Sequence, residues 1–174
     1  MGYSRSFGFR SFENIVRRGR EKTPTSGSIK IGAPITIDPA APGKVKAAAA
    51  GASTAGAGVA VYEHVQAKGL DAAVAGTADF DAVPANQFVQ RVSGKGVKVW
   101  LKNSAAKTLA DGRVIPANNL LAGSVVLGSL ALGAQLTPDG SGAFKVANGT
   151  TDGNWLTVES VNTTTGVVEA TLNF

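Results

Sequence analysis

Hydrophobic and polar residues alternate with a period of two in several short stretches, which is the pattern of a strand with one buried face. These stretches lie at residues 29–37, 59–65, 88–101 and 155–174. Pro34 interrupts the first stretch, which suits an edge strand or a bulge. Many short strands separated by turns are typical of a sandwich or barrel. The pattern therefore predicts an all-β fold, a small barrel or sandwich of short antiparallel strands with an extended N-terminal arm.

Glycine-rich turns predict how neighbouring strands pair. Residues 93–96 read Ser-Gly-Lys-Gly and separate residues 88–92 from 97–101, which predicts a hairpin. A second predicted hairpin turns at residues 162–166, between the two halves of the C-terminal stretch.

Two segments favour a helix instead. Ser11 can cap a short helix over residues 12–18 that ends at Gly19. The alanine-containing residues 104–110 are the second candidate. Both are shorter than a helix that is stable by itself in water.

Two parts of the chain resemble each other. Three pairs of segments align, namely 29–36 with 130–137, 43–46 with 142–145, and 61–65 with 157–161. The separation changes from 101 to 99 to 96 residues, as changes in loop length produce. Two copies are too few for a solenoid, so a pseudo-symmetric barrel or two packed β units is expected. The units span about 28–66 and 129–174 and are joined by a middle segment.

The positive charge is concentrated at the N-terminus. The chain has 17 Lys and Arg against 12 Asp and Glu, but six of the basic residues and only two acidic ones lie in residues 1–22. Four of the eleven aromatic residues lie in the first twelve positions. Residues 1–27 are therefore predicted to form a basic, aromatic arm with its linker, and residues 28–174 a β-rich body that is almost neutral.

Rings mixed with arginines suit a segment that docks into an apolar groove with an acidic rim. The alternative is a solvated terminus without a partner. The predicted partner-binding residues of the arm are Tyr3, Phe7, Phe9, Arg10, Phe12, Arg17, Arg18 and Arg20.

The composition excludes several kinds of site. The chain has no cysteine, which excludes disulfides and thiol chemistry, and one histidine, His64. His64 with Ser53 and Asp38 is a weak catalytic candidate, because Ser53 lacks a strand–turn–helix setting. Asp79 and Asp81 lack the further oxygen ligands of a cation site. We therefore expect no enzymatic activity, no metal and no cofactor.

Small and uncharged residues dominate two further stretches. Alanine and glycine make up 50 of the 174 residues, so a thin core is expected. They fill much of residues 47–62, which are predicted to be a loop leading into a strand. Residues 114–138 carry no charge over the length of a membrane span, but Pro116, Asn118 and Asn119 argue against a membrane segment.

The body resembles a known group of proteins. The segments that carry the resemblance are residues 31–33, 43–46 and 58–63, and, in the second half, 132–137, 142–145 and 166–170. In their rhythm of short strands and Gly/Thr turns, residues 28–174 resemble small head decoration or minor capsid proteins of tailed bacteriophages. The resemblance implies a structural virion protein on the outer capsid surface that binds the major capsid protein and stabilises the shell. It also implies a homo-oligomer, commonly a trimer. The arm is not shared by every such protein, and its docking on capsid subunits or neighbouring copies is our own expectation from its rings and arginines.

Two other functions remain open from the sequence. A β-sandwich attachment module for cell or glycan binding would use Trp100 and Trp155 as an exposed platform. A nucleic-acid-binding protein would use the basic arm, with Lys95, Lys98 and Lys102 beside Trp100 as a weaker patch. The near-neutral body argues against nucleic acid as a partner, and the proline and amide residues within the uncharged stretch argue against a membrane.

Overall fold

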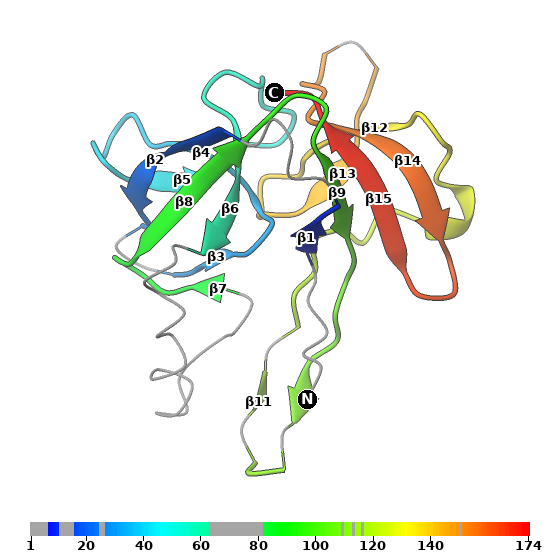
Figure 1. The fold of residues 1–174 in the computed structure, drawn as a ribbon, viewed down its shortest axis with the longest axis horizontal. Helices are drawn as coiled ribbons and strands as arrows, with labels where there is room; N and C mark the ends of the chain where they lie inside the picture. The colour runs from blue at the N-terminus through cyan, green and yellow to red at the C-terminus, as the bar shows by residue number, and fades with distance from the viewer. Residues whose placement is uncertain are drawn as a thin grey trace.

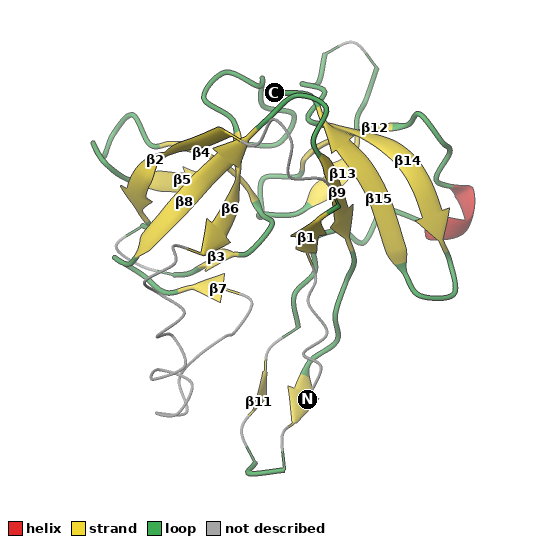
Figure 2. Cartoon of the chain, viewed as in Figure 1, coloured by secondary structure: helices red, strands yellow, loops and turns green. Residues whose placement is uncertain are grey.

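The computed structural model describes residues 7–10, 16–24, 27–62, 82–108, 110–112, 114–115, 117–149 and 151–174. Over these residues the fold is all-β, which confirms the predicted class, and the strands form two larger antiparallel sheets and two short strand pairs (Figure 2). The two larger sheets lie beside each other and are joined by the short connection from β8 (Phe88–Ser93) to β9 (Lys98–Leu101), seen at the top of Figure 1.

The first sheet has five strands in the order β2-β8-β6-β4-β5. Apart from β8, these are β2 (Val16–Lys22), β4 (Pro34–Ile37), β5 (Val45–Ala47) and β6 (Gly58–Tyr62). The two edges of the sheet meet, because Lys22 at the end of β2 forms a parallel bridge with Lys44 just before β5. The sheet is therefore nearly closed into a small barrel.

The second sheet has six strands in the order β1-β9-β15-β14-β12-β13. Apart from β9, these are β1 (Phe7–Phe9), β12 (Gln135–Pro138), β13 (Phe144–Val146), β14 (Leu156–Asn162) and β15 (Val167–Leu172). The hairpin of β14 and β15 is the one predicted from the turn at residues 162–166. Leu121 forms a parallel bridge with Phe144 and so covers the β13 edge.

Both sheets repeat one pairing scheme. In the first, β2 pairs with β8, β8 with β6, β6 with β4 and β4 with β5. In the second, β9, β15, β14, β12 and β13 pair in the same succession. The strands within residues 16–93 are called the first unit below, and those within residues 98–172 the second unit. β1 is an additional strand that pairs with β9 of the second unit.

The pairing register identifies equivalent residues in the two units. Ile35 in β4 and Leu136 in β12 stand 101 residues apart and have the same place in their hairpins. They lie opposite Gly58 and Leu156 on the neighbouring strand, which stand 98 residues apart. The separation for this third strand is thus 98 residues, where the sequence alignment gives 96.

The turn at residues 93–96 does not make the predicted hairpin. β8 and β9 belong to different sheets, and the N–H groups of Gly94 and Gly96 donate to the backbone carbonyls of Phe174 and Leu172. A glycine-rich turn specifies a local bend. Which sheet each flanking strand joins depends on long-range pairing that the turn does not encode.

The two predicted helices are wrong where the structure describes them. Residues 16–18 of the first belong to β2, whose ladder with β8 prevails over a short helix, while residues 12–15 lie outside the described residues. In the second, β10 (Lys107–Thr108) pairs with β11 (Val114–Ile115). Helix propensity over one or two turns is too weak to compete with such pairing.

Short elements complete the fold. The predicted strand at residues 29–37 is divided into β3 (Ile29–Lys30), which pairs with β7 (Ala82–Val83), and β4. Gly32, with φ +85°, makes the bend between them. One turn of 3₁₀ helix, η2 (Leu127–Ser129), precedes β12. Within the part of the chain described, no helix is long and apolar enough to cross a membrane.

Small residues let the two units approach closely. The alanine- and glycine-rich stretch before β6 is a loop, as predicted, and its Gly51 accepts a hydrogen bond from the N–H of Gly153 at 3.1 Å. A Cβ on Gly153 would overlap the carbonyl oxygen of Ala52. The same carbonyl accepts a 2.7 Å hydrogen bond from Nε1 of Trp155. The loops before β6 and β14, which are equivalent in the two units, therefore pack backbone to backbone.

Candidate functional site

The described part of the predicted arm forms strands in both sheets. Tyr3 and Phe12 lie outside the described residues, while Phe7 and Phe9 lie in β1 and Arg10 follows it. β1 pairs with β9 in the second unit, whereas β2 pairs with β8 in the first. Backbone hydrogen bonds thus make these arm residues part of the body.

Phe7 is a core residue rather than an exposed anchor. It is 6% exposed and packs against Gly32 of the first unit, where its ring leaves no room for a side chain. Phe9 is half-buried and meets Phe7 edge to face, with ring centroids 5.2 Å apart. Phe7 therefore connects the N-terminal strand to both units, and in this arrangement its side chain is not available to a partner.

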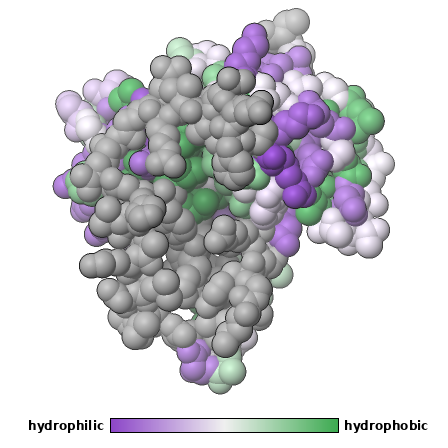
Figure 3. Space-filling model, viewed as in Figure 1, coloured by the Kyte–Doolittle hydropathy of each residue, from purple (hydrophilic) through white to green (hydrophobic). Residues whose placement is uncertain are grey.

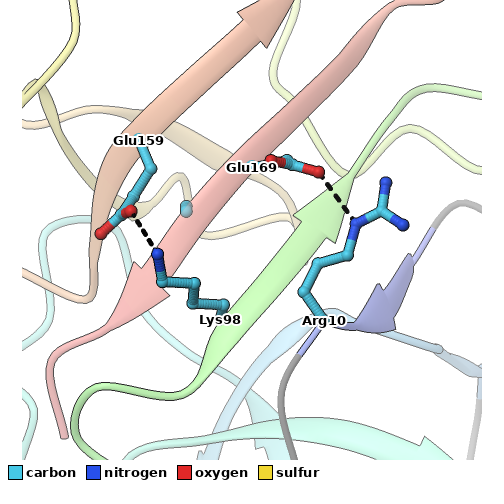
Figure 4. A pocket seen from close by; sticks show the side chains of 5 residues that line it. Arg10, Lys98, Glu159 and Glu169 are labelled. Atoms are coloured by element: carbon cyan, nitrogen blue, oxygen red, sulfur yellow. Dashed lines mark hydrogen bonds and ion pairs between the residues drawn. The ribbon is translucent and has the colours of Figure 1, made fainter.

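Arg10 belongs to a cluster of charged side chains on the second sheet (Figure 4). Its Nε lies 2.8 Å from Oε1 of Glu169, and Nζ of Lys98 lies 3.0 Å from Oε2 of Glu159. These four side chains and Ala170 border a pocket of about 140 Å³. Two cations balance two carboxylates, so the cluster fastens neighbouring strands together and presents no net charge to a ligand.

Hydrogen bonds stabilise the ionised form of Glu159. The hydroxyl of Thr171 and then the ammonium group of Lys98 donate to its carboxylate, and they hold its pKa below the ordinary value of 4.5. Glu159 is therefore ionised at neutral pH. It acts there as a hydrogen-bond acceptor and not as an acid.

The remaining predicted arginines lie along β2. Arg17 pairs with Val92 and Arg20 with Gln90, and the ladder shifts register between them at a bulge that includes Arg18. The structure thus places the backbone of all three beside β8, on the first unit. They do not lie on a free arm.

The second unit contains a long connection that the first unit lacks. Residues 23–33 separate β2 from β4, whereas residues 102–134 separate the equivalent strands β9 and β12. Within this 102–134 connection, the β10–β11 hairpin projects away from both sheets (Figure 1). Ser104 and Asn118 close its base with two backbone hydrogen bonds of 2.9 and 3.0 Å. A lone two-stranded hairpin is marginally stable in water, so this element suits a contact with a partner.

The 102–134 connection also carries exposed apolar side chains. Val114 is 60% exposed, Val126 63% and Leu132 71%, and these are the three most exposed large hydrophobic residues of the described chain. In Figure 3, hydrophobic residues lie along the outer margin of the right-hand part of the molecule, beside a hydrophilic front. All three residues lie within the 102–134 connection.

Sequence reasoning did not identify this connection as a site. Its signal in the sequence is the uncharged stretch at residues 114–138, which we weighed only as a membrane segment. The connection stands out only beside the short equivalent connection of the first unit. Recognising that the two connections are equivalent requires the strand pairing of the structure.

The other sequence candidates are not assembled into a site by the described residues. His64, Asp79 and Asp81 lie outside these residues. Ser53 is exposed in a loop, and the carboxylate of Asp38 pairs with Lys46 at 3.4 Å. No group of three His, Cys, Asp or Glu residues that could hold a metal ion occurs in the part of the chain that the structure describes.

The predicted tryptophan platform is wrong. Trp155 is fully buried and donates its indole N–H to Ala52. Trp100 is half-buried and covers Gly8 on β1, where a side chain would overlap the indole. Trp155 therefore belongs to the core, and Trp100 packs on the β1–β9 strand pair. The two residues cannot form one exposed surface for glycans.

No protein family model matches the chain, and no curated protein matches it.

Proposed function

We propose that the protein is a structural component of a phage virion that binds the outer surface of the assembled capsid and stabilises it, as decoration or cement proteins do. The observation that carries this proposal is the 102–134 connection, which exposes Val114, Val126 and Leu132 outside a pair of sheets. The major capsid protein is the proposed partner. The protein acts as a homo-oligomer, a trimer by resemblance, and has no catalytic role, cofactor, membrane or nucleic acid of its own.

Such a role agrees with the construction of the body. A capsid presents many identical sites, so modest contacts in each copy give strong retention when neighbouring copies also touch. Binding to the shell stabilises the bound fold by mass action, which compensates for a core of small residues. We also propose that the basic residues predicted for the arm, Arg17, Arg18 and Arg20, pair with acidic groups of the shell.

Substitution of the exposed apolar residues tests the proposal. The double variant Val126→Ser and Leu132→Ser is mixed with purified, undecorated shells of its own virus, and occupancy is measured by co-sedimentation. We expect about a tenfold or greater loss of affinity, because two apolar contacts are removed. Val146→Ser is the matched control, since Val146 is an exposed apolar residue outside the connection. Equal occupancy of the double variant and the wild type would contradict the proposal.

Replacement of the projecting hairpin is an independent test. Residues 105–117 are replaced by Asn-Gly, because the antiparallel bridge between Ser104 and Asn118 can be closed by a two-residue turn. The two larger sheets should remain folded, as judged by circular dichroism, while shell occupancy falls. Deletion of residues 1–22 is not a clean test, because it removes β1 and β2 from the two sheets.

A further inference from the structure

The interior of the first unit differs from that of the second at four equivalent positions. Glu21 lies opposite Val89, and Leu101 lies opposite Val168. Val89 and Val168 have the same place in their sheets, so Glu21 and Leu101 are equivalent. The other equivalences follow in the same way from the β6–β8 and β14–β15 pairs. All four residues of the second unit are apolar and buried. The equivalent pairs are Glu21 and Leu101, Gly58 and Leu156, Arg91 and Ala170, and Ser93 and Leu172.

The first unit thus has a buried ion pair where the second has apolar contacts. Nη2 of Arg91 lies 3.1 Å from Oε1 of Glu21, and the two side chains are 9% and 13% exposed. Gly58 provides the room, because a Cβ there would overlap Cγ of Arg91. Removing two charges from water is costly. Since the second unit forms the same pairing scheme with apolar residues, the ion pair is not needed for the fold.

The ion pair is also incompletely hydrogen-bonded. Nη1 of Arg91 donates to the carbonyl of Gly56 at 3.2 Å. In the described structure, Nε of Arg91 and Oε2 of Glu21 are buried without a hydrogen-bond partner. A guanidinium group has five N–H donors, and Glu21 and Gly56 use two of them. Arg91 therefore has N–H donors to spare. Buried polar groups in native folds are rarely left without a hydrogen-bond partner.

A pocket of about 280 Å³ borders Arg91 of this ion pair. It is lined by Arg91, Ser93 and Thr54, by the apolar residues Ile37, Ala57 and Phe174, and by Gly56. Pockets for small-molecule ligands are usually larger, so this volume suits a single side chain. Because Glu21 already balances the charge of Arg91, the pocket favours a neutral group with an apolar body and a hydrogen-bond acceptor.

We propose that this pocket receives a tyrosine side chain of a partner protein. The ring packs against Ile37 and Phe174, with its hydroxyl end toward the guanidinium group of Arg91. The phenolic oxygen accepts a hydrogen bond from one of the Nη N–H donors of Arg91 that Glu21 and Gly56 do not use. The inference rests on the proposed function for the identity of the partner, the capsid protein, but the chemistry of the pocket is testable without it.

The first experiment uses p-cresol, which is the tyrosine side chain without its backbone. It is titrated into the ¹⁵N-labelled full chain, with toluene as the comparison ligand. We expect saturable shifts of the Arg91 Nε–H resonance and of the Gly56 and Ser93 amides. The affinity for toluene should be lower by about tenfold or more, because toluene leaves the guanidinium donors unpaired. The absence of saturable shifts at Arg91, or equal binding of toluene, would overturn the proposal.

Two variants test the pocket itself. The triple variant Glu21→Leu, Gly58→Leu and Arg91→Ala carries the residues of the second unit at three of the four positions, so it should stay folded with a more apolar interior and lose p-cresol binding. Thr54→Trp fills the rim of the pocket and leaves the interior of the unit unchanged. It therefore tests p-cresol binding at this pocket even if the triple variant does not fold. Unchanged p-cresol affinity in Thr54→Trp would refute the site.

Co-sedimentation with shells separates this inference from the proposed function. If the wild type binds shells, Thr54→Trp should bind several-fold more weakly, and equal binding would refute the role of the pocket in attachment. If the wild type does not bind shells, the proposed function fails. The p-cresol titration then still decides whether the pocket recognises a tyrosine side chain.

Discussion

At Gly153 the backbones of the two units meet without a side chain between them. Its N–H donates to Gly51, and a methyl group at this position would overlap the carbonyl oxygen of Ala52. Backbone cannot move aside as the end of a flexible side chain can. The high content of alanine and glycine thus has a structural reason at this contact, which composition alone does not reveal.

We predict that Gly153→Ala destabilises the protein by about 1 to 3 kcal/mol, the usual range for overpacking. Urea denaturation gives the free energy of unfolding. Gly123→Ala is the matched control, because a Cβ at Gly123 meets open space. If both variants unfold at the same urea concentration as the wild type, the close approach at Gly153 does not restrict the size of the residue at this position.

A second prediction at the scale of residues concerns the buried ion pair. Arg91→Ala alone leaves the carboxylate of Glu21 buried without its partner, and should cost about 3 to 5 kcal/mol. The triple variant with Glu21→Leu and Gly58→Leu removes that charge and fills the space, so most of the loss should be recovered. Thermal denaturation measures both. A triple variant no more stable than Arg91→Ala would contradict the view that apolar residues can replace the ion pair.

Among the elements, β1 shows how a segment that suits docking can belong to the core. Its rings and its neighbouring arginine predict attachment, yet Phe7 is buried between the units. Sequence identifies Phe7 as a residue that needs an apolar partner. It does not show whether that partner is another protein or Gly32 and Leu101 of the same chain.

Phe7→Ala should therefore destabilise the isolated protein by about 3 to 5 kcal/mol, as expected for loss of a buried ring. Phe9→Ala should cost clearly less, because Phe9 is half-buried. Calorimetry of the two variants in the absence of any shell measures the difference. If Phe7→Ala is as stable as the wild type, Phe7 is not needed for the core and is again a candidate for contact with a partner.

The strands that the sequence predicts best are those with strict alternation and a tight turn. β14 and β15 satisfy both conditions and form the predicted hairpin. The turn at residues 93–96 is equally rich in glycine, but β8 and β9 each find longer ladders in separate sheets. Local pattern specifies strands and bends, whereas long-range pairing decides sheet membership. For this reason the pocket at Arg91, whose lining residues range from Ile37 to Phe174, could not be predicted from the sequence.

At the scale of the whole molecule, three carboxylates of the second unit link stability to pH. Burial disfavours ionisation of Asp139, but hydrogen bonds from Ser141 and Ala143 outweigh it and lower its pKa below the ordinary 3.8. The N–H of Asn148 lowers the pKa of Asp152 from the same value. The Thr171 hydroxyl lowers that of Glu159 from 4.5. In the unfolded chain these groups bind protons at higher pH than in the folded one.

The free energy of unfolding should consequently be constant from neutral pH down to the ordinary values near 4, and should fall as the pH drops through the lower folded values. The loss is modest, because the side chain of Glu159 is exposed and water competes for its hydrogen bonds. Urea denaturation at about pH 7 and about pH 3 measures it. Asp139→Asn should reduce the difference between the two pH values, and an unchanged difference would argue against the contribution of Asp139.

The two units share one pairing scheme but differ in two features. The second contains the long 102–134 connection with its exposed apolar residues, while the first contains a buried ion pair beside a pocket. Each feature is absent from the other unit, which shows that the pairing scheme forms without it. A repeated pairing scheme thus supplies its own reference for separating residues that the fold needs from residues available for function.

The pairing of β1 with β9 also sets an order of events during synthesis. β1 ends at Phe9, but its hydrogen-bonding partner begins at Lys98, and β2 likewise waits for β8. On the ribosome, β1 must stay unpaired until β9 has been made. Such long-range pairing slows folding and leaves apolar surface open to aggregation. Until then the rings of Phe7 and Phe9 have no partner strand, and the nascent chain is vulnerable to aggregation at this segment.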